Sequence, residues 1–505
     1  MNIKQAKEYI KNSVNLYLKK DEFGEYRVPV VRQRPIFLLG APGIGKTAIM
    51  EQIAQEMGIA LVAYSMTHHT RQSALGLPFI TEKTYGEKTV SVSEYTMSEI
   101  IASIYDTMEA SGMKEGILFL DEINCVSETL APSMLQFLQY KVFGRHAVPE
   151  GWVIVTAGNP PEYNKSVREF DVVTMDRLKV LEVEPDLRIW KEYAVEKRIH
   201  NAIISYLDLK KDQFYCMEMT TKGRSYVTAR GWEDLSEMLN LYEEEQLPVD
   251  ETLVGQYLRN EKVVKEFTAY YDLYNKYKKD YHIEDILDGS PSVQAIARAK
   301  EAAFDERLSL LGMLLDKVQA DMKDVMEQAS FLSDLKNPLK AIGAEAEKCQ
   351  TGQVLTMLEK QAEGRKKLLE NLQNANSLSD ADRRKHRSVV RFLEESRKEM
   401  AVREFAGGME SYEFLKEKYG RLVARMKQET EVVGRELHAL FAFAEEAFAE
   451  GNEMLILVTE LTVNTASARF IATFGSPDYK RHSEELMLSE RSNDIKAQIA
   501  ELKLD

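Results

Sequence analysis

The sequence has few cysteines and no cysteine pairs. Its three cysteines, Cys125, Cys216 and Cys349, lie far apart and show none of the paired spacings that metal ligands use. The eight histidines likewise form no HxxxH or similar cluster. We therefore expect neither a disulfide framework nor a histidine–cysteine metal centre, and the cysteine usage fits a reducing compartment such as the cytoplasm.

The chain also lacks an excess of positive charge and any long apolar segment. Its formal net charge is -15, so there is no global basic surface for nucleic acid or an anionic membrane. The net charge does not exclude a local basic groove. No window approaches the ~18 uncharged apolar residues of a membrane span. Residues 1–20 mix Lys and Glu with apolar residues at helical spacing, which is not the pattern of a signal peptide. We expect a cytoplasmic protein without a membrane span.

Short apolar runs alternate with helical patterns in the first half of the chain, whose 505 residues allow several domains. Strands are predicted at residues 36–39, 60–64, 117–120, 153–156 and 180–183, with helices between them such as 47–57 and 129–140. Continuous apolar strands that alternate with helices indicate a parallel sheet covered on both faces. Two predicted hairpins, at residues 78–95 and 143–152, interrupt this pattern.

The second half of the chain is almost entirely helix-forming. It begins after a predicted linker at residues 288–291, whose sequence is Asp-Gly-Ser-Pro. Apolar residues then follow an unbroken 4-3-4-3 spacing from Phe304 to Leu332, which is typical of a coiled coil; two less regular runs cover residues 355–372 and 412–440. The polar loop 373–380 contains a helix N-cap candidate, Ser379. A packed helical bundle and an arm that projects to grip a partner both fit these stripes.

A glycine-rich loop follows the first predicted strand and opens a helix. It matches the pattern GxxxxGK[ST], which is a phosphate-binding loop in this strand–helix context. Glycines let backbone N–H groups turn toward phosphate oxygens, and the helix N-terminus adds a favourable dipole. We expect Lys46 to reach the β- and γ-phosphates and the Thr47 hydroxyl to bind Mg²⁺. The loop comprises Gly40, Ala41, Pro42, Gly43, Ile44, Gly45, Lys46 and Thr47.

Polar side chains follow two further predicted strands. Asp121 and Glu122 come directly after the strand at 117–120, at the edge where ligands bind in open parallel sheets. We expect Asp121 to lie near Mg²⁺ and Glu122 to act as the base that polarises the attacking water. Asn159 follows the next buried strand and is expected to hold that water against the γ-phosphate; an ordinary Asn-Pro turn is the alternative.

Five segments in this order resemble the AAA+ ATPases, and within them the MoxR-like branch. They are the loop at 40–47, Asp-Glu-Ile-Asn at 121–124, Ala-Gly-Asn-Pro at 157–160, Asp-Arg-Leu at 176–178 and Thr-Ala-Arg-Gly-Trp-Glu at 228–233. The resemblance covers about residues 30 to 245. It implies an α/β fold, a P-loop NTPase αβα core with a five-stranded parallel sheet, followed by a small helical lid at roughly 186–250. The hairpin at 78–95 resembles the insertion in the second helix that marks this branch, and the one at 143–152 resembles the hairpin before the first sensor.

The resemblance and the composition together divide the chain into four parts. Residues 1–34 are an N-terminal helix and lead-in, 35–185 the AAA+ nucleotide-binding core, 186–288 the helical lid with an extension, and 289–505 a C-terminal all-α, coiled-coil-like region. MoxR-like chains often end soon after the lid, so the resemblance implies nothing about the last part.

The resemblance also assigns roles to three polar residues. Asn159 matches the first sensor, Arg177 the arginine finger that reaches the neighbouring subunit's site, and Arg230 the second sensor on a lid helix. A guanidinium stabilises charge on the transferring phosphoryl group, and a finger is worth ~10³–10⁵ in rate. The alternatives are a surface ion pair of Arg177 with Asp171 or Asp176, and action of Arg230 either within its own subunit or across the interface.

A finger supplied by a neighbour requires an oligomer. The resemblance therefore implies an ATPase that binds ATP and Mg²⁺ in a homo-oligomeric ring, expected to be a hexamer, and remodels a partner complex together with a von Willebrand factor A domain protein. The helical half would be the adaptor for that partner. One alternative is a nucleic-acid-stimulated motor of the same clade, against which the acidic total argues. Its basic pore would use Lys141, Arg145, Lys165 and Arg168. Another is a scaffold that holds nucleotide without cleaving it, against which the complete set of site residues argues.

Overall fold

The computed structural model describes residues 1–68, 76–143, 145–163, 167–220, 223–403, 405–448 and 452–486. The chain forms two compact units. The first comprises Met1–Ile189 and Ala362–Val390, and the second comprises Trp190–Gln361 and Arg391–Asp505. Residues 288–291 form a short connection between two helices of the second unit. The four-part division of the sequence stays a prediction.

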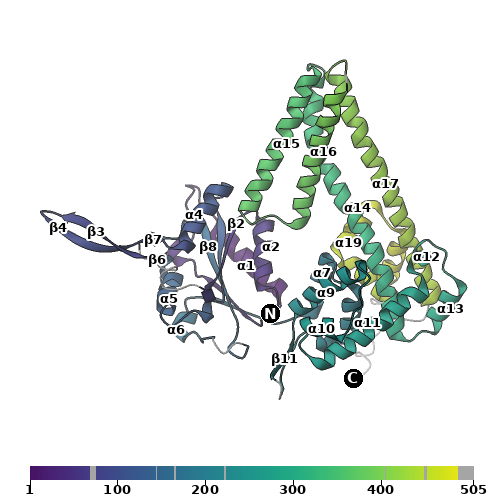
Figure 1. Cartoon of the computed structure of the whole chain (residues 1–505), viewed down its shortest axis with the longest axis horizontal. Coiled ribbons are helices and arrows are strands. Elements are labelled where there is room, and N and C mark those ends of the chain that lie inside the picture. Colours follow the sequence, from purple (N-terminus) through teal and green to yellow (C-terminus); the bar gives the residue numbers. More distant parts are fainter. Residues whose placement is uncertain are drawn as a thin grey trace, which may run out of the picture. The chain divides into compact units, whose positions relative to one another are not determined.

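A five-stranded parallel sheet lies at the centre of the first unit (Figure 1). Its strand order is β2-β5-β8-β1-β9, so β1 lies between β8 and β9. Leu38 of β1 is opposite Ala157 of β8 on one side and Leu181 of β9 on the other. Every predicted strand is confirmed, and each extends slightly beyond its predicted ends. The strands are β1 (Ile36–Gly40), β2 (Ala60–Ser65), β5 (Gly116–Asp121), β8 (Trp152–Gly158) and β9 (Lys179–Val183).

Helices cover both faces of this sheet, as its continuous apolar strands require. On one face, α4 and α5 pack in an apolar cluster with Phe37, Leu118 and Ile154. On the other face, α2 contacts β2 and β5 and packs against α1. The predicted α/β P-loop architecture is thereby confirmed. The helices are α1 (Ile3–Tyr17), α2 (Lys46–Met57), α4 (Glu99–Ser111), α5 (Ala131–Tyr140) and α6 (Val172–Met175), the tips of α15 (Thr351–Asn374) and α16 (Asp380–Val402), and the 3-10 turns η1 (Val30–Arg32), η2 (Met66–His68) and η3 (Ile123–Cys125).

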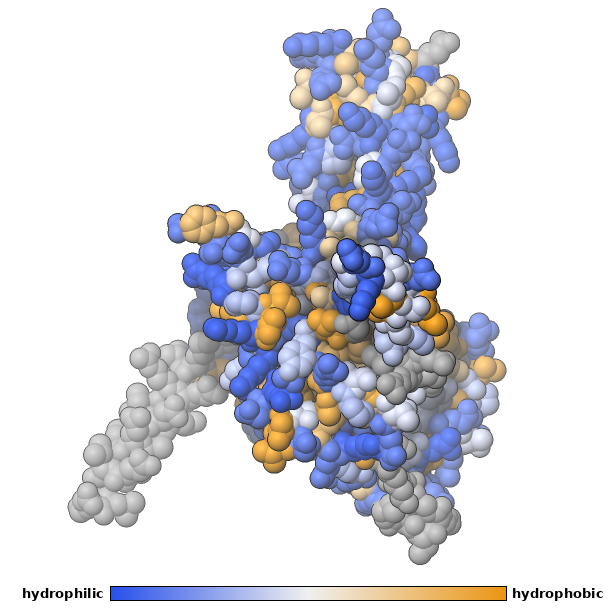
Figure 2. Space-filling view, turned by 90° about the vertical axis from the view of Figure 1, so that its left-hand side faces the viewer, coloured by the Kyte–Doolittle hydropathy of each residue, from blue (hydrophilic) through white to orange (hydrophobic). Residues whose placement is uncertain are grey.

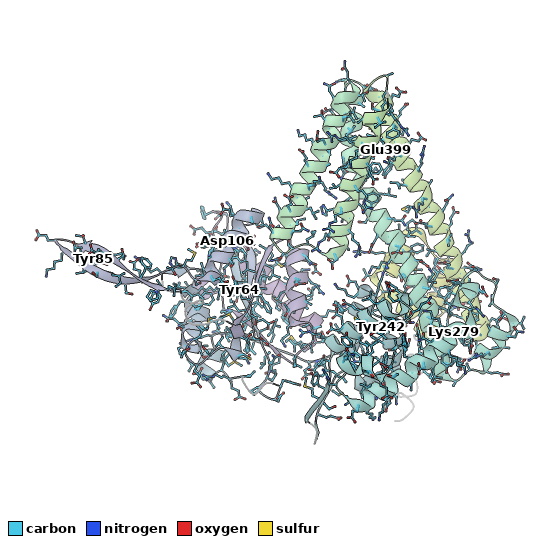
Figure 3. All side chains as sticks on the ribbon, viewed as in Figure 1. Tyr64, Tyr85, Asp106, Tyr242, Lys279 and Glu399 are labelled. Carbon is cyan, nitrogen blue, oxygen red and sulfur yellow. The ribbon has the colours of Figure 1, made fainter. Side chains whose placement is uncertain are left out.

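Two antiparallel hairpins interrupt the alternation of strands and helices in the first unit, as predicted. β3 (Pro78–Tyr85) and β4 (Lys88–Tyr95) pair along their full length around a turn at Gly86, whose φ is 63°. Tyr85 lies at the far end of this hairpin with its ring in solvent (Figure 3). The second hairpin pairs β6 (Val142–Phe143) with β7 (His146–Ala147), and Gly144 lies outside the described residues.

The β2 edge of the sheet is closed by a loop from the second half of the chain. This loop joins α15 to α16, and we call its residues 374–378 the clasp. The Leu61 N–H donates to the Ala375 carbonyl at 2.9 Å, and Asn376 Nδ2 donates to the Leu61 carbonyl at 3.3 Å. Ala375 is fully buried in the apolar cluster beneath α4. The clasp therefore takes up pairing groups that an open edge strand would present to another chain.

The β9 edge is closed by the first residue of the chain. The Met1 amino group donates to the Glu182 carbonyl at 2.9 Å, and the Glu184 N–H donates to the Met1 carbonyl at 2.9 Å. At both edges of the sheet, strand groups thus bond to residues that lie far away in the sequence.

The second unit is mostly helical. Helix α16 runs into this unit from the first. Its predicted N-cap, Ser379, is confirmed, because the Asp382 N–H donates to Ser379 Oγ at 3.0 Å. Among the described residues no single helix is long and apolar enough to cross a membrane; only α18 and α19 together have that length and composition, with a bend of 88° between them. The elements are α7 (Leu187–Lys197), α8 (Asn201–Leu209), η4 (Lys211–Gln213), the hairpin β10 (Cys216–Thr220) and β11 (Gly223–Val227), α9 (Ala229–Glu244), α10 (Glu251–Tyr257), α11 (Glu261–Tyr281), α12 (Ile283–Leu287), α13 (Val293–Glu301), α14 (Phe304–Ala346), α17 (Gly408–Ala447), α18 (Glu453–Val463) and α19 (Thr465–Phe474).

The two longest helices, α14 and α17, run antiparallel. Tyr419 OH donates to the Leu332 carbonyl at 3.3 Å, and Gly343 leaves room for Tyr412, since a Cβ at Gly343 would lie 2.5 Å from that ring. Five of the heptad-spaced residues of α14 are buried in one cluster with α12, α13, α17, α18 and α19, whereas Phe304 at the start of the helix is 48% exposed. This burial favours a packed bundle over the middle of the helix, and the coiled coil itself stays a prediction. The five buried residues are Leu311, Leu315, Val318, Met322 and Val325.

Exposed apolar side chains lie at the two connections that join α14 to α15 and α16 to α17. They gather where α14 and α16 end and α15 and α17 begin (Figure 2), and Val402 and Met409 are 87% and 40% exposed there. Nearby, Lys418 donates to Glu399 at 2.7 Å and links α17 to α16 (Figure 3).

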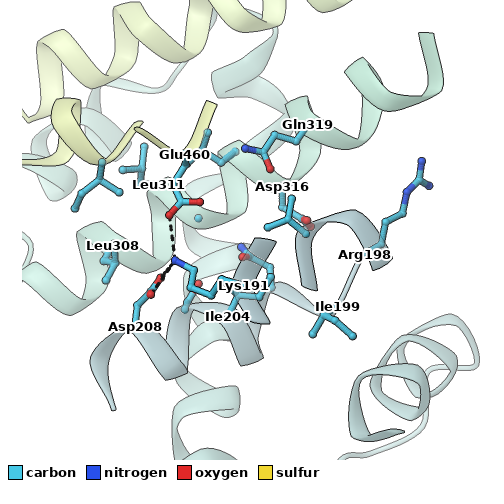
Figure 4. Close-up of a pocket in the computed structure, with 16 residues that line it drawn as sticks. Lys191, Arg198, Ile199, Ile204, Asp208, Leu308, Leu311, Asp316, Gln319 and Glu460 are labelled. Carbon is cyan, nitrogen blue, oxygen red and sulfur yellow. Dashed lines mark hydrogen bonds and ion pairs between the residues drawn. The ribbon is translucent and has the colours of Figure 1, made fainter. Parts of the chain in front are cut away.

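Lys191 of α7 links the segment predicted to be the lid to α18 within the second unit. Its Nζ donates to Asp208 Oδ1 at 2.9 Å and to Glu460 Oε1 at 3.0 Å (Figure 4). Burial alone would lower the pKa of Lys191, but the carboxylates of Glu460 and Asp208 outweigh it and raise the pKa above its usual value. The ion pairs therefore join α7, α8 and α18, which lie far apart in the sequence.

The clasp predicts a protected amide at the edge of the sheet. Asn376→Gly removes the amide bonded to the Leu61 carbonyl, while glycine still accepts the φ of 51° at this position. Loss of one hydrogen bond, about 1 kcal/mol, should speed hydrogen exchange of the Leu61 N–H roughly 5-fold. Glu370→Ala, at an exposed site on α15, should leave that rate unchanged. Equal exchange of Leu61 in both variants would contradict the role given to the clasp.

Candidate functional site

The glycine-rich loop lies between β1 and α2, at the carboxyl edge of the sheet. Gly43 and Gly45 have φ of 74° and 92°, a left-handed backbone that only glycine adopts readily. Gly40 has a different constraint, because a Cβ there would lie 2.6 Å from the Val183 carbonyl of the neighbouring strand. α2 begins at Lys46, so its first N–H groups face the loop. Residues 40–47 thus form the predicted strand–loop–helix.

Lys46 joins this loop to the tip of β8. Its ammonium donates to the Gly40 and Ala41 carbonyls, both at 2.8 Å, and to Asn159 Oδ1 at 2.9 Å. The side chain is 8% exposed, so these bonds are largely shielded from water. Lys46 and Asn159 lie 113 positions apart in the sequence and meet because β1 and β8 are neighbours in the sheet. The structure therefore brings together two of the predicted site residues.

Thr47 and Asp121 also meet at this edge, although β8 lies between β1 and β5 in the sheet. Thr47 Oγ1 donates to Asp121 Oδ2 at 2.9 Å, and the Glu122 N–H donates to Asp121 Oδ1 at 2.8 Å. Hydroxyl and carboxylate oxygens are ligands that Mg²⁺ prefers, and Mg²⁺ usually takes only one or two carboxylates together with phosphates and waters. The described part of the chain has no cluster of three or more His, Cys, Asp or Glu that could hold a metal ion alone. Thr47 and Asp121 fit the predicted Mg²⁺ site.

Glu122 occupies a turn at the end of β5. Its φ is 54°, a left-handed conformation that costs a non-glycine residue roughly 1–2 kcal/mol. Ser65 Oγ, at the end of β2, donates to Glu122 Oε2 at 3.2 Å. The half-buried carboxylate is thus held at the same edge as the loop. Sequence analysis missed Ser65, because a single serine at the end of a strand does not indicate which residue it will contact.

Asn124 is a second residue that sequence analysis did not single out. It lies in η3 directly after Glu122, and its Nδ2 donates to the Asn159 carbonyl at 2.8 Å. Its backbone carbonyl accepts from the Arg168 N–H at 2.9 Å. The only sequence signal was its place in the Asp-Glu-Ile-Asn segment at 121–124.

Arg177 follows α6, a short helix whose N-cap is Asp171. The Thr174 N–H donates to Asp171 Oδ1 at 2.8 Å. Hydrogen bonds from Thr174, and then the charge of Arg177, lower the pKa of Asp171. Arg177 itself is exposed, and among the described residues no carboxylate forms an ion pair with it. The surface ion pair considered from the sequence is therefore not formed, and the guanidinium is available to another molecule.

Arg230 belongs to the second unit. It is the second residue of α9, and it is exposed. The N-cap Thr228 accepts from the Gly231 N–H at 3.1 Å, which explains why the helix begins here. The role of Arg230 as a second sensor stays a prediction.

The three described residues of the alternative basic pore, Lys141, Arg145 and Arg168, are buried or paired with carboxylates. Lys141, which ends α5, is 2% exposed, so its assignment to a pore is wrong. Arg145 pairs with Glu94, and Arg168 pairs with Glu128, so both charges are neutralised locally. Lys165 lies outside the described residues.

Comparison with protein families identifies the class of this site. Residues 36–174 match the model of the ATPase family associated with various cellular activities (AAA). The match begins at β1 and includes the loop, Asp121, Glu122 and Asn159, and it supports an AAA+ ATPase domain that binds ATP. It ends before Arg177 and does not distinguish the MoxR-like branch. No match was found among curated proteins.

Substitution of Lys46 tests nucleotide binding directly. Lys46→Ala removes an ammonium that would form charge-assisted hydrogen bonds to phosphate, which are worth about 1.5–3 kcal/mol. Isothermal titration should therefore show ATP binding weakened roughly 10- to 100-fold. Lys88→Ala, an exposed site at the start of β4, is the control and should bind like the parent. Parent ATP affinity in Lys46→Ala would show that the loop does not bind the phosphates of ATP.

The buried Lys141 predicts an unusual pH dependence of stability. Burial disfavours its charged form and lowers its pKa to about 8 from the usual value of 10.5. The unfolded chain therefore binds the proton more tightly, so stability should rise as pH rises from about 8 to 10.5. Lys141→Met should raise the free energy of unfolding at pH 7 by about 1–3 kcal/mol and flatten this rise.

Urea unfolding at several pH values measures this effect. Lys19→Met, at an exposed site, is the matched control and should change stability by less than about 0.5 kcal/mol. A loss of stability at pH 7 in Lys141→Met would mean that the buried charge is well compensated.

Proposed function

We propose that the chain is a Mg²⁺-dependent ATPase that works as an oligomeric ring and remodels a partner protein complex. The observation that carries the proposal is the meeting of three strand ends at one edge. There the Lys46 ammonium contacts Asn159 at 2.9 Å, and Thr47 contacts Asp121 at 2.9 Å. The match of residues 36–174 to the AAA family supports the same conclusion.

The loop residues have distinct tasks in this proposal. Backbone N–H groups between Gly40 and Gly45, with the first turn of α2, bind the phosphates of ATP. Lys46 exchanges part of its present contacts for the β- and γ-phosphate oxygens. Thr47 and Asp121 hold Mg²⁺, which neutralises phosphate charge when bound.

Three further residues act on hydrolysis. Glu122 accepts a proton from the attacking water or orients it, and Asn159 positions that water with its side-chain amide. Arg177, exposed and without a carboxylate partner in the described part of the chain, reaches the site of a neighbouring subunit. One copy alone would then lack a charge needed in the transition state, which favours an oligomer, proposed to be a hexamer. Arg230 is proposed as a second sensor, acting in cis or in trans.

We also propose the MoxR-like branch and a von Willebrand factor A domain protein as partner. The hairpin β3–β4, between β2 and α4, agrees in position with the insertion typical of that branch. The helical second unit, in which Lys191 ties the lid segment to α18, would carry the adaptor surface for the partner.

The variant Glu122→Gln tests the enzymatic claim. It keeps the size of the side chain and removes the base, so ATP should bind with parent affinity while turnover falls by roughly 10²–10⁴. Phosphate release and ATP titration measure the two effects. Glu109→Gln, the same change at an exposed site on α4, should hydrolyse ATP at the parent rate. A parent rate in Glu122→Gln would show that this carboxylate is not the base.

The same variant tests the partner. With ATP it should accumulate in an assembly larger than the 57.8 kDa chain and retain its bound partner. Capture of a von Willebrand factor A domain protein supports the remodelling function. Capture of nucleic acid, with turnover that falls steeply with salt, would instead favour the motor alternative.

A further inference from the structure

We infer that Asn124 is a positioning residue that fixes Asn159 for ATP hydrolysis, an inference that rests on the proposed ATPase function. Asn124 touches neither the loop nor a carboxylate of the site in any described hydrogen bond. Its side chain instead donates to the Asn159 carbonyl at 2.8 Å. Because Asn159 follows the last residue of β8 directly, a bond to its backbone sets the direction of its side chain.

The two sides of Asn159 are held by different partners. Asn124 holds its backbone carbonyl, and Lys46 holds its side-chain oxygen at 2.9 Å. A phosphate that takes the Lys46 ammonium draws that bond away from Asn159. The bond from Asn124 does not involve the phosphate-binding groups, so it remains when nucleotide is bound. Asn124 therefore keeps Asn159 in place at the stage when its amide is needed.

The amide of Asn124 is not explained by stability. Its side chain is 4% exposed, and its Oδ1 is buried without a hydrogen-bond partner among the described residues. An unsatisfied buried polar atom destabilises the folded state. The oxygen faces Gly158, where a Cβ would lie only 2.7 Å from Asn124 Cγ. An apolar side chain would remove the unpartnered oxygen but would also lose the donor to the Asn159 carbonyl, so this donor is what the amide contributes.

The backbone of Asn124 extends the same connection. Its carbonyl accepts from the Arg168 N–H at 2.9 Å. The segment that follows Arg168 leads into α6 and then to Arg177. One residue thus links the end of β5, the tip of β8 and the start of the segment that carries the proposed finger.

The decisive variant is Asn124→Leu. It keeps the branched shape of the side chain, at a larger volume, and removes both the donor to Asn159 and the unpartnered oxygen. We expect kcat for ATP to fall about 10-fold or more, since displacement of a positioned group by ~1 Å can cost ~10²-fold. KM and the dissociation constant for ATP should stay within about 3-fold. The melting temperature should change little, because loss of the unpartnered oxygen offsets loss of the hydrogen bond to the Asn159 carbonyl. Asn12→Leu, at an exposed site on α1, is the control and should keep the parent rate.

A second variant reaches the same contact from the other side. Gly158→Ala places a methyl group against the Asn124 amide and leaves Asn124 itself intact. It should give the same fall in kcat with little change in KM. This variant decides the question if Asn124→Leu does not fold.

The outcomes separate the two claims. A kcat within 2-fold of the parent in folded Asn124→Leu overturns the inference. So does a fall in kcat that only follows loss of melting temperature or ATP affinity, because that would be a structural role. Absence of ATP turnover in the assembled, unsubstituted chain would instead overturn the proposed function.

Discussion

The nucleotide site depends on the contact between the Lys46 ammonium and the tip of β8. A parallel sheet places the carboxyl ends of its strands along one edge, and the order β5-β8-β1 puts three of them side by side. The loop after β1 carries the cation, β5 ends at Asp121, and β8 is followed by the amide of Asn159. The contact of Lys46 with Asn159 places the loop next to the groups that are proposed to act on water.

Each unit is also stabilised by contacts between residues that lie far apart in the sequence. The clasp closes the β2 edge with residues more than three hundred positions away in the sequence, as the pair Leu61 and Asn376 shows. Helices α15 and α16 begin or end in the second unit and meet in the clasp, so the chain passes into the first unit and back. In the second unit, Lys191 joins the lid segment to α18. Residues of the C-terminal half therefore contribute to the structure of both units: the clasp pairs with β2, and Glu460 of α18 binds Lys191.

Much of the fold could be predicted because its signals are local. Five continuous apolar runs, each followed by helical spacing, predict a parallel sheet, and the glycine pattern at 40–47 predicts the phosphate loop. The contacts of Ser65 and Asn124 could not be predicted, because they depend on which strands are neighbours. The burial of Lys141 could not be predicted either, since lysine is usually exposed and nothing in its surrounding sequence marks an exception. The clasp was seen only as a polar loop, because its partner lies in β2.

The most direct test of the central claim is phosphate release by the unsubstituted chain, measured against ATP, Mg²⁺ and protein concentration. A site completed by Thr47, Asp121 and a neighbour's Arg177 should give turnover that saturates with ATP, stops when Mg²⁺ is chelated, and rises per chain as the protein assembles. No phosphate release above background from concentrated, assembled protein would contradict the account.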